Sequence, residues 1–114
     1  MKKLPALFYR TVSGSEPVRV WLLSLDPTDR RSIGFDIATV EIGWPIGMPT
    51  CRAISGRRGL WEVRTDLTDG RIARTFFTVE RDQMVLLHGI IKKTQKTPPG
   101  ALDLAQRRQK EVQQ

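Results

Sequence analysis

The alternation of apolar and polar residues predicts a strand and then a helix at the start of the chain. Residues 5–12 are rich in aromatic and β-branched side chains that alternate with period two, as expected for a strand. Ser15 then precedes Pro17, which predicts an N-cap followed by a proline in the first helical turn. The buried stripe of this helix, expected to end near residue 25, consists of Val18, Trp21, Leu22 and Leu25.

A second helix is expected to begin almost at once. Asp26 suits the N-cap, Pro27 suits the first helical position, and Asp29 places an acid in the first turn. The helix is expected to reach Gly43, and its apolar face is formed by Ile33, Ile37, Val40 and Trp44. The two helices are therefore predicted to form a hairpin with almost no loop. The proline-rich residues 44–50 that follow are expected to be a connecting loop.

The second half of the chain reads as an antiparallel meander and a last helix. Its first strand places Trp61 and Val63 on one face and Glu62 and Arg64 on the other. Turns are expected at residues 68–70 and 80–83, and the third strand is apolar enough to be covered on both faces. The C-terminal helix has few large apolar residues, so its own sequence anchors it only weakly. In order, the expected strands and helix cover residues 60–67, 71–79, 84–91 and 100–112.

This order of elements predicts an α+β domain. We expect two N-terminal helices packed on a mostly antiparallel sheet of about four strands, plus a C-terminal helix. The 114 residues fit a single domain that spans residues 1–114. The apolar run at the N-terminus is interrupted by proline, so we expect neither a signal peptide nor a membrane anchor.

Composition narrows the compartment and the partners. A single cysteine, Cys51, forms no internal disulfide, and no Cys/His cluster suggests zinc, so we expect a cytoplasmic protein without metal or cofactor. The net charge is +7 and it is unevenly distributed. Residues 1–50 carry six basic and five acidic side chains, whereas residues 51–114 carry thirteen and seven. A positive field of this kind favours RNA or DNA, or an acidic protein partner, although a basic face can also be merely solvated.

Three segments follow one another at a spacing found in a known group of toxins. They are residues 59–64 (GLWEVR), residues 71–77 (RIARTFF) and residues 87–98 (LHGIIKKTQKTP). These motifs resemble the phage-type HigB-like branch of the RelE/ParE superfamily, over nearly the whole chain. The resemblance implies a RelE-like fold, cleavage of ribosome-associated mRNA, and neutralisation by a small antitoxin, expected to be a helix-turn-helix protein. The family's catalytic residues do not transfer as a set, because the only tyrosine here is Tyr9 and the only histidine is His88.

Two arginines are the first candidates for catalysis. If the hairpin register pairs Leu67 with Arg71, Arg64 lies directly opposite Arg74, and two facing guanidiniums favour an anion between them. Metal-free RNA cleavage needs charge stabilised on the pentavalent phosphorus, which guanidiniums do well. The alternative is a surface lattice of salt bridges with Glu62 and Asp66.

Proton transfer points to other residues. His88 has the only side chain with an ordinary pKa near neutrality, but a lone histidine in an apolar strand can equally be a packed core residue. Glu62 is either a base or an ion-pair partner of Arg64. Lys92 and Lys93 follow the last strand and either contact the scissile phosphate or belong to a solvated loop.

The remaining residues are candidates for RNA binding, or residues to which we assign no catalytic role. Arg57 and Arg58 in a glycine-flanked loop, together with Lys96, are candidate RNA-binding residues, with simple solvation as the alternative. Trp61 is interpreted as core and not as a stacking platform for bases. Cys51 next to Arg52 suggests a lowered thiol pKa, but no partner base is evident.

These patterns support three functions. The first is a ribosome-dependent, metal-independent mRNA endonuclease that acts as the toxin of a type II toxin–antitoxin system. The second is a toxin that only binds and blocks DNA gyrase, as ParE-like members of the superfamily do. The third is an inactive prophage remnant. Mapped mRNA cleavage would favour the first, accumulated DNA–gyrase complexes the second, and unaffected growth the third.

Overall fold

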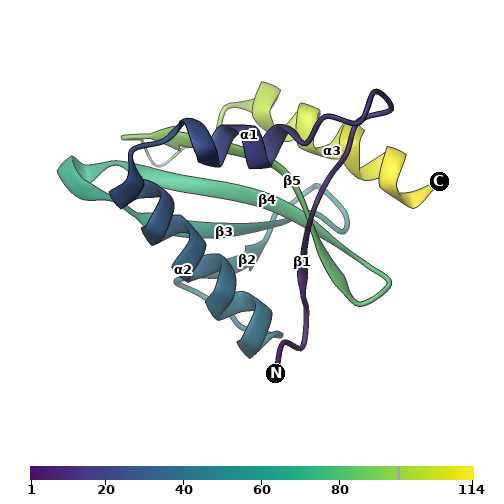
Figure 1. The fold of residues 1–114 in the computed structure, drawn as a ribbon, viewed down its shortest axis with the longest axis horizontal. Coiled ribbons are helices and arrows are strands. Elements are labelled where there is room, and N and C mark those ends of the chain that lie inside the picture. The colour runs from purple at the N-terminus through teal and green to yellow at the C-terminus, as the bar shows by residue number, and fades with distance from the viewer. Residues whose placement is uncertain (95) are drawn as a thin grey trace.

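The computed structural model describes residues 1–94 and 96–114 and contains a five-stranded mixed sheet with helices on both faces (Figure 1). The sheet order is β1-β5-β4-β3-β2, in which β1 runs parallel to β5 and the other neighbours are antiparallel. The prediction of an α+β fold with a mostly antiparallel sheet is confirmed, but the sheet has five strands and not about four, and the added β1 is parallel to its neighbour. The elements are β1 (Ala6–Phe8), α1 (Pro17–Ser24), α2 (Pro27–Gly43), β2 (Cys51–Ala53), β3 (Trp61–Asp66), the 3-10 turn η1 (Thr68–Gly70), β4 (Ile72–Glu80), β5 (Gln83–Lys92) and α3 (Pro99–Gln113).

The two edge strands account for the difference from the predicted sheet. β1 is a strand for three residues and not for the eight of residues 5–12, because it pairs with β5 only as far as Leu86. β2 lies at the other edge and pairs antiparallel with β3, with Arg52 opposite Glu62. A three-residue strand is too short to show an alternating pattern, so β2 was not predicted.

The first two helices have the predicted extents, but they do not form a hairpin. α1 packs on β5 and α2 packs on β3, so the helices diverge across one face of the sheet, as Figure 1 shows. A Cβ atom at Gly89 would overlap the Trp21 ring, so glycine at this position allows α1 to approach β5 closely. Asp26 caps α2 as predicted, accepting a hydrogen bond from the Thr28 N–H at 3.0 Å.

The N-cap predicted for α1 is wrong. Glu16 and not Ser15 occupies this position, and its side chain makes no capping hydrogen bond. Ser15 instead lies within hydrogen-bond distance of Thr11, with 2.9 Å between the two hydroxyl oxygens. Pro17 still begins the helix, since a missing N–H does no harm in the first turn.

The sheet separates two apolar clusters. On the α1–α2 face, the core includes Val18, Ile33, Ile37, Val40, Val63, Phe77, Met84 and Leu86. On the α3 face, it includes Tyr9, Leu60, Phe76, Val85, Leu87 and Ala105. β5 contributes to both clusters and is packed by α1 and α3, which confirms the prediction of a strand covered on both faces.

The β3–β4 turn sets the register of the central hairpin. Asp69 and Gly70 both adopt left-handed backbone conformations, with φ angles of 61° and 72°, which twist the chain back on itself in a tight hairpin. The N–H of Leu67 donates to the carbonyl of Arg71 at 2.9 Å. Arg64 therefore lies directly opposite Arg74, as the sequence predicted.

Polar contacts anchor α3 more firmly than its sequence suggested. The buried Gln109 side chain donates to the Arg58 carbonyl at 3.0 Å, and Arg108 donates to the Leu87 carbonyl at 2.8 Å. The Tyr9 hydroxyl donates to Glu111 Oε1 at 2.9 Å. These contacts come from the start of the chain, the β2–β3 loop and β5, so three separate segments hold the C-terminal half of α3.

Candidate nucleic-acid interface

The side chains on the α3 face of the sheet form transverse rows, and α3 covers only some of them. One row contains Arg52, Glu62, Phe76 and His88, which come from β2, β3, β4 and β5. The next row, further from the β4–β5 turn, contains Arg64, Arg74 and Ile90. Ile90 of this row packs against the α3-face cluster, as do Ala101 and Leu102 at the start of α3, so the first turns of the helix border the arginine row.

The two facing arginines have different environments. The side chain of Arg74 is 3% exposed, and its Nη1 donates to Glu62 Oε2 at 2.7 Å. The side chain of Arg64 is 29% exposed and forms a looser ion pair with Asp66, 3.6 Å from Nε to Oδ1. The predicted register is therefore right, but the accessible guanidinium of the pair is that of Arg64.

Glu62 has different partners from those predicted. Its carboxylate is 1% exposed and accepts hydrogen bonds on Oε2 from both Arg74 and Arg52, the latter at 3.1 Å. Arg64 instead pairs with Asp66. With both Glu62 oxygens buried, an RNA hydroxyl has no access to this carboxylate, which argues against Glu62 as a general base.

His88 lies at the border between α3 and the arginine row. The imidazole is half-buried and lies parallel to the Phe76 ring, with 6.3 Å between the ring centroids. Burial, and then the positive charge of Arg108, lowers the pKa of His88 below its ordinary value. The imidazole is therefore neutral at pH 7 and has a nitrogen that can accept a proton.

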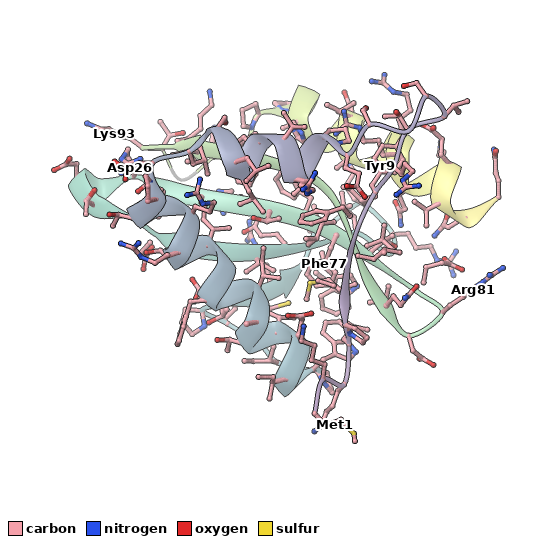
Figure 2. The ribbon with its side chains drawn as sticks, in the orientation of Figure 1. Met1, Tyr9, Asp26, Phe77, Arg81 and Lys93 are labelled. Carbon is pink, nitrogen blue, oxygen red and sulfur yellow. The ribbon has the colours of Figure 1, made fainter. Side chains whose placement is uncertain are left out.

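The candidate lysines lie at the far end of β5. Lys92 is the last residue of this strand, opposite Ile72, and Lys92, Lys93 and Lys96 are all exposed. Figure 2 shows Lys93 at the opposite end of the molecule from Arg81, which belongs to the β4–β5 turn. Lys92 follows Ile90 by two residues on β5, so it lies on the same sheet face, one row beyond the arginine row.

The two arginines of the β2–β3 loop are in different situations. Arg57 Nη1 donates to Asp103 Oδ1 at 2.7 Å and to Gln106 Oε1 at 2.9 Å, which ties the loop to α3. Arg58 contributes its backbone carbonyl to Gln109, and its side chain is exposed. Of the two, the Arg58 guanidinium is the one free of these contacts with α3.

The sequence of the chain matches a family model over residues 20–110, described as phage derived protein Gp49-like (DUF891). The chain belongs to the Gp49-like family. This is a toxin-like family of the RelE kind that occurs in toxin–antitoxin systems. No curated protein is significantly similar to the chain.

The part of the chain that matches the Gp49-like family contains the whole arginine face. It extends from within α1 almost to the end of α3 and leaves out β1 and Tyr9. Every candidate site residue named from the sequence lies inside it, as does Arg52. The match therefore covers the strands and loops that carry these side chains.

Arg52 and Arg108 are the residues near this face that sequence reasoning missed. Arg52 follows a proline-rich loop, and its position opposite Glu62 depends on the short strand β2. Arg108 packs over the Tyr9 ring, 5.4 Å from its centroid, and burial lowers the pKa of its guanidinium. The only sequence signal was the basic excess of the second half of the chain, which marks no single residue.

Trp61 and Cys51 belong to the opposite face. Trp61 packs against Trp44 and Phe77, with ring centroids 4.9 and 6.3 Å away, which confirms its assignment to the core. Burial, with a further contribution from the negative charge of Glu62, raises the pKa of the Cys51 thiol to about 11. The suggestion of a lowered pKa at Cys51 is therefore wrong.

One surface hollow, of about 540 Å³, lies away from the arginine row and is bordered by residues around Tyr9, the β4–β5 turn and the end of α3. Within residues 1–94 and 96–114, no group of three or more His, Cys, Asp or Glu side chains is arranged to hold a metal ion. None of the helices in the described part of the chain has both the length and the apolar character that a membrane crossing needs.

Proposed function

We propose that this chain is the toxin of a type II toxin–antitoxin system and that it cleaves mRNA on the ribosome as a metal-independent endoribonuclease. The observation that carries the proposal is the Arg64–Arg74 pair on the sheet face beside α3, in a chain of the toxin-like Gp49-like family. The uneven positive charge supports a polyanionic substrate. We further propose that the chain is one domain with a RelE-like fold, of the phage-type HigB-like branch.

The proposed reaction is attack of a ribose 2′-oxygen on the adjacent phosphorus. The 2′-hydroxyl loses its proton, negative charge grows on the phosphoryl oxygens, and the 5′-oxygen leaves with a proton. Arg64 contacts the phosphate directly in this scheme. Arg74, held by Glu62, contributes positive charge from beneath. Guanidiniums suit this task because they stay charged and present several N–H groups in one plane.

His88 is the proposed proton acceptor. It is a diagonal neighbour of Arg74 on the same sheet face, at about 7–8 Å between such positions in an antiparallel pair. Its lowered pKa keeps the imidazole neutral and able to take the 2′ proton at pH 7. In the same scheme, Lys92 or Lys93 lies against the scissile phosphate, and Lys96 and Arg58 contact RNA outside the scissile bond. Arg57 supports the loop that carries Arg58.

The partners follow from this activity. We propose a cognate antitoxin, a small helix-turn-helix protein, as the neutralising partner, with the ribosome and mRNA as targets. The site of action is the cytoplasm. The basic surface favours an acidic segment of the antitoxin, because opposite charges speed association and favour the correct partner.

The test is expression without antitoxin, followed by mapping of mRNA ends and cleavage by purified protein on translating ribosomes. We expect growth arrest and new mRNA ends, with Arg64→Ala slowing cleavage by about 10²–10³ while ribosome binding persists. Arg19→Ala, which removes an exposed cation from α1 on the other face, is the matched control and should cleave normally. Intact mRNA with trapped DNA–gyrase complexes would replace the proposal with gyrase inhibition. Unaffected growth with soluble protein would indicate an inactive remnant.

A further inference from the structure

One buried carboxylate binds two guanidiniums on the α3 face, beside a third. Glu62 Oε2 accepts a hydrogen bond from Arg74 on β4 and another from Arg52 on β2. Arg64 is the next residue of β3 on this face and lies directly opposite Arg74. Removing a carboxylate from water costs several kcal/mol, so its place inside a cationic cluster requires compensation by these two charge-assisted bonds.

The geometry at Glu62 differs from that of an ion pair that only holds elements together. Asp29 and Arg71 form such a pair between α2 and the β3–β4 turn, with Nη1 to Oδ2 at 2.8 Å and Nη2 to Oδ1 at 3.0 Å. Both oxygens of Asp29 are used there. At Glu62, a single oxygen serves two guanidiniums from different strands. Among the described residues the other oxygen, Oε1, is buried and has no hydrogen-bond partner. The arrangement fixes the arginines and leaves the carboxylate incompletely satisfied.

The exposure of the guanidiniums shows which of them can meet a ligand. The side chain of Arg52 is 47% exposed, that of Arg64 is 29% exposed, and that of Arg74 is 3% exposed. Arg52 and Arg64 are diagonal neighbours on antiparallel strands, about 7–8 Å apart. Glu62 offsets one of the three positive charges and Asp66 offsets another, so the cluster stays positive, and Arg52 and Arg64 are its guanidiniums that a ligand can reach.

We propose that Glu62 is a positioning residue of the RNA site and that Arg52 is a further ligand of the RNA backbone. Through Oε2, Glu62 fixes Arg74 below the scissile phosphate and aims Arg52 at a neighbouring phosphate. The carboxylate itself touches no substrate. This inference rests on the proposed function for its substrate class, a single-stranded RNA.

The Arg52 arm of the test measures binding. The affinity of the protein for a short single-stranded RNA is followed by fluorescence anisotropy from 50 to 200 mM salt, on Arg52→Ala and Arg52→Lys. Loss of one phosphate contact should lower the slope of log K against log salt by about 0.7, and Arg52→Lys, which keeps the charge, should restore it. An unchanged affinity and slope in Arg52→Ala would overturn its role as a ligand.

The Glu62 arm measures cleavage of bound RNA. Glu62→Gln keeps the size of the side chain and removes the charge that holds the guanidiniums. Misplacing a group at the reacting centre by about 1 Å can cost about 10²-fold, so the rate at saturating ribosomes should fall by that order, while affinity falls no further than in Arg52→Ala. Asp29→Asn is the matched control: it weakens a partly buried ion pair between α2 and the β3–β4 turn and should lower the melting temperature without changing the rate per folded molecule. If Glu62→Gln also loses only stability, its positioning role is refuted.

These outcomes separate the inference from the proposed function. A wild-type protein that binds RNA through Arg52 but never cleaves mRNA would support the binding site and refute the nuclease. A protein that cleaves normally with Arg52→Ala and Glu62→Gln would refute the inference and leave the nuclease intact. If Glu62→Gln does not fold, the two Arg52 variants still decide, because a half-exposed edge residue tolerates substitution.

Discussion

Replacing Arg57 and Arg58 separately should show that two adjacent arginines act on different properties. The Arg57 side chain is 23% exposed and donates to Asp103 and Gln106 of α3. The Arg58 side chain is exposed, and only its backbone carbonyl takes part in the contact with Gln109. Arg57→Ala should therefore reduce stability, and Arg58→Ala should reduce RNA binding.

The size of each effect follows from the contacts. Asp103 is 65% exposed, so solvent screens its charge, and the two hydrogen bonds of Arg57 together should stabilise the fold by about 1 kcal/mol. For a domain of this size, that corresponds to a melting temperature lower by about 4 °C. Loss of one phosphate contact at Arg58 should lower the steepness of log affinity against log salt by about 0.7. Between 50 and 200 mM salt, the variant should therefore lose about 2.6-fold less affinity than the wild type.

The assay pairs thermal unfolding with the salt dependence of binding to a single-stranded RNA. Arg19→Ala serves as the control for a general loss of positive charge, because Arg19 lies on α1 on the other side of the sheet. The reasoning would be refuted if Arg57→Ala kept its melting temperature and lost the salt slope, because the contacts with α3 would then be irrelevant in solution. If Arg58→Ala keeps the salt dependence of the wild type, Arg58 and its loop do not contact RNA.

Three further substitutions test the fold and the proposed proton acceptor. In the wild type, the cleavage rate should rise with pH through a value below 6.5 and be constant near pH 7, because burial lowers the pKa of His88. His88→Gln should abolish this rise and slow cleavage by about 10²–10⁴-fold. A variant that keeps the rise would exclude His88 as the proton acceptor. Gly89→Ala should destabilise the protein by about 1–3 kcal/mol in chemical unfolding, since the added methyl overlaps Trp21; a neutral effect would mean that α1 can move away. Tyr9→Phe should cost about 0.5–1.5 kcal/mol through the lost bond to Glu111, and equal stability would show that the end of α3 is not held there.

The lowered pKa of His88 also has a consequence for stability. In the unfolded chain, His88 binds a proton near its ordinary pKa, whereas in the folded protein it does so only at lower pH. Above about pH 6.5, the ionisation of His88 therefore does not affect the free energy of unfolding. As the pH falls from that value through the pKa of His88 in the folded protein, it lowers the free energy of unfolding. His88→Gln should remove this part of the acid sensitivity, which unfolding curves at pH 5 and 7 would measure.

Local sequence patterns determined the elements that depend on near neighbours. Asp69 and Gly70 tolerate left-handed backbone conformations, so the β3–β4 turn and with it the Arg64–Arg74 register could be read from the sequence. Helical spacing of apolar residues and the Asp26 cap likewise gave the extent of α2. These signals act over a few residues, and the tertiary structure has no need to override them.

Tertiary structure alone decided which polar side chains are buried. Arg74 and Glu62 occupy strand positions that alternation assigns to one face, but their ion pair and the second bond from Arg52 depend on the pairing of β2, β3 and β4. The pairing of Arg57 with Asp103 joins residues 46 positions apart, and the neighbourhood of His88 includes Arg108 from α3. No local pattern encodes such contacts, because the residues around an arginine in the sequence are the same whether or not the fold places a distant carboxylate beside it. The sequence therefore indicated a basic face, and the fold selected Arg52 and Arg64 as its accessible guanidiniums.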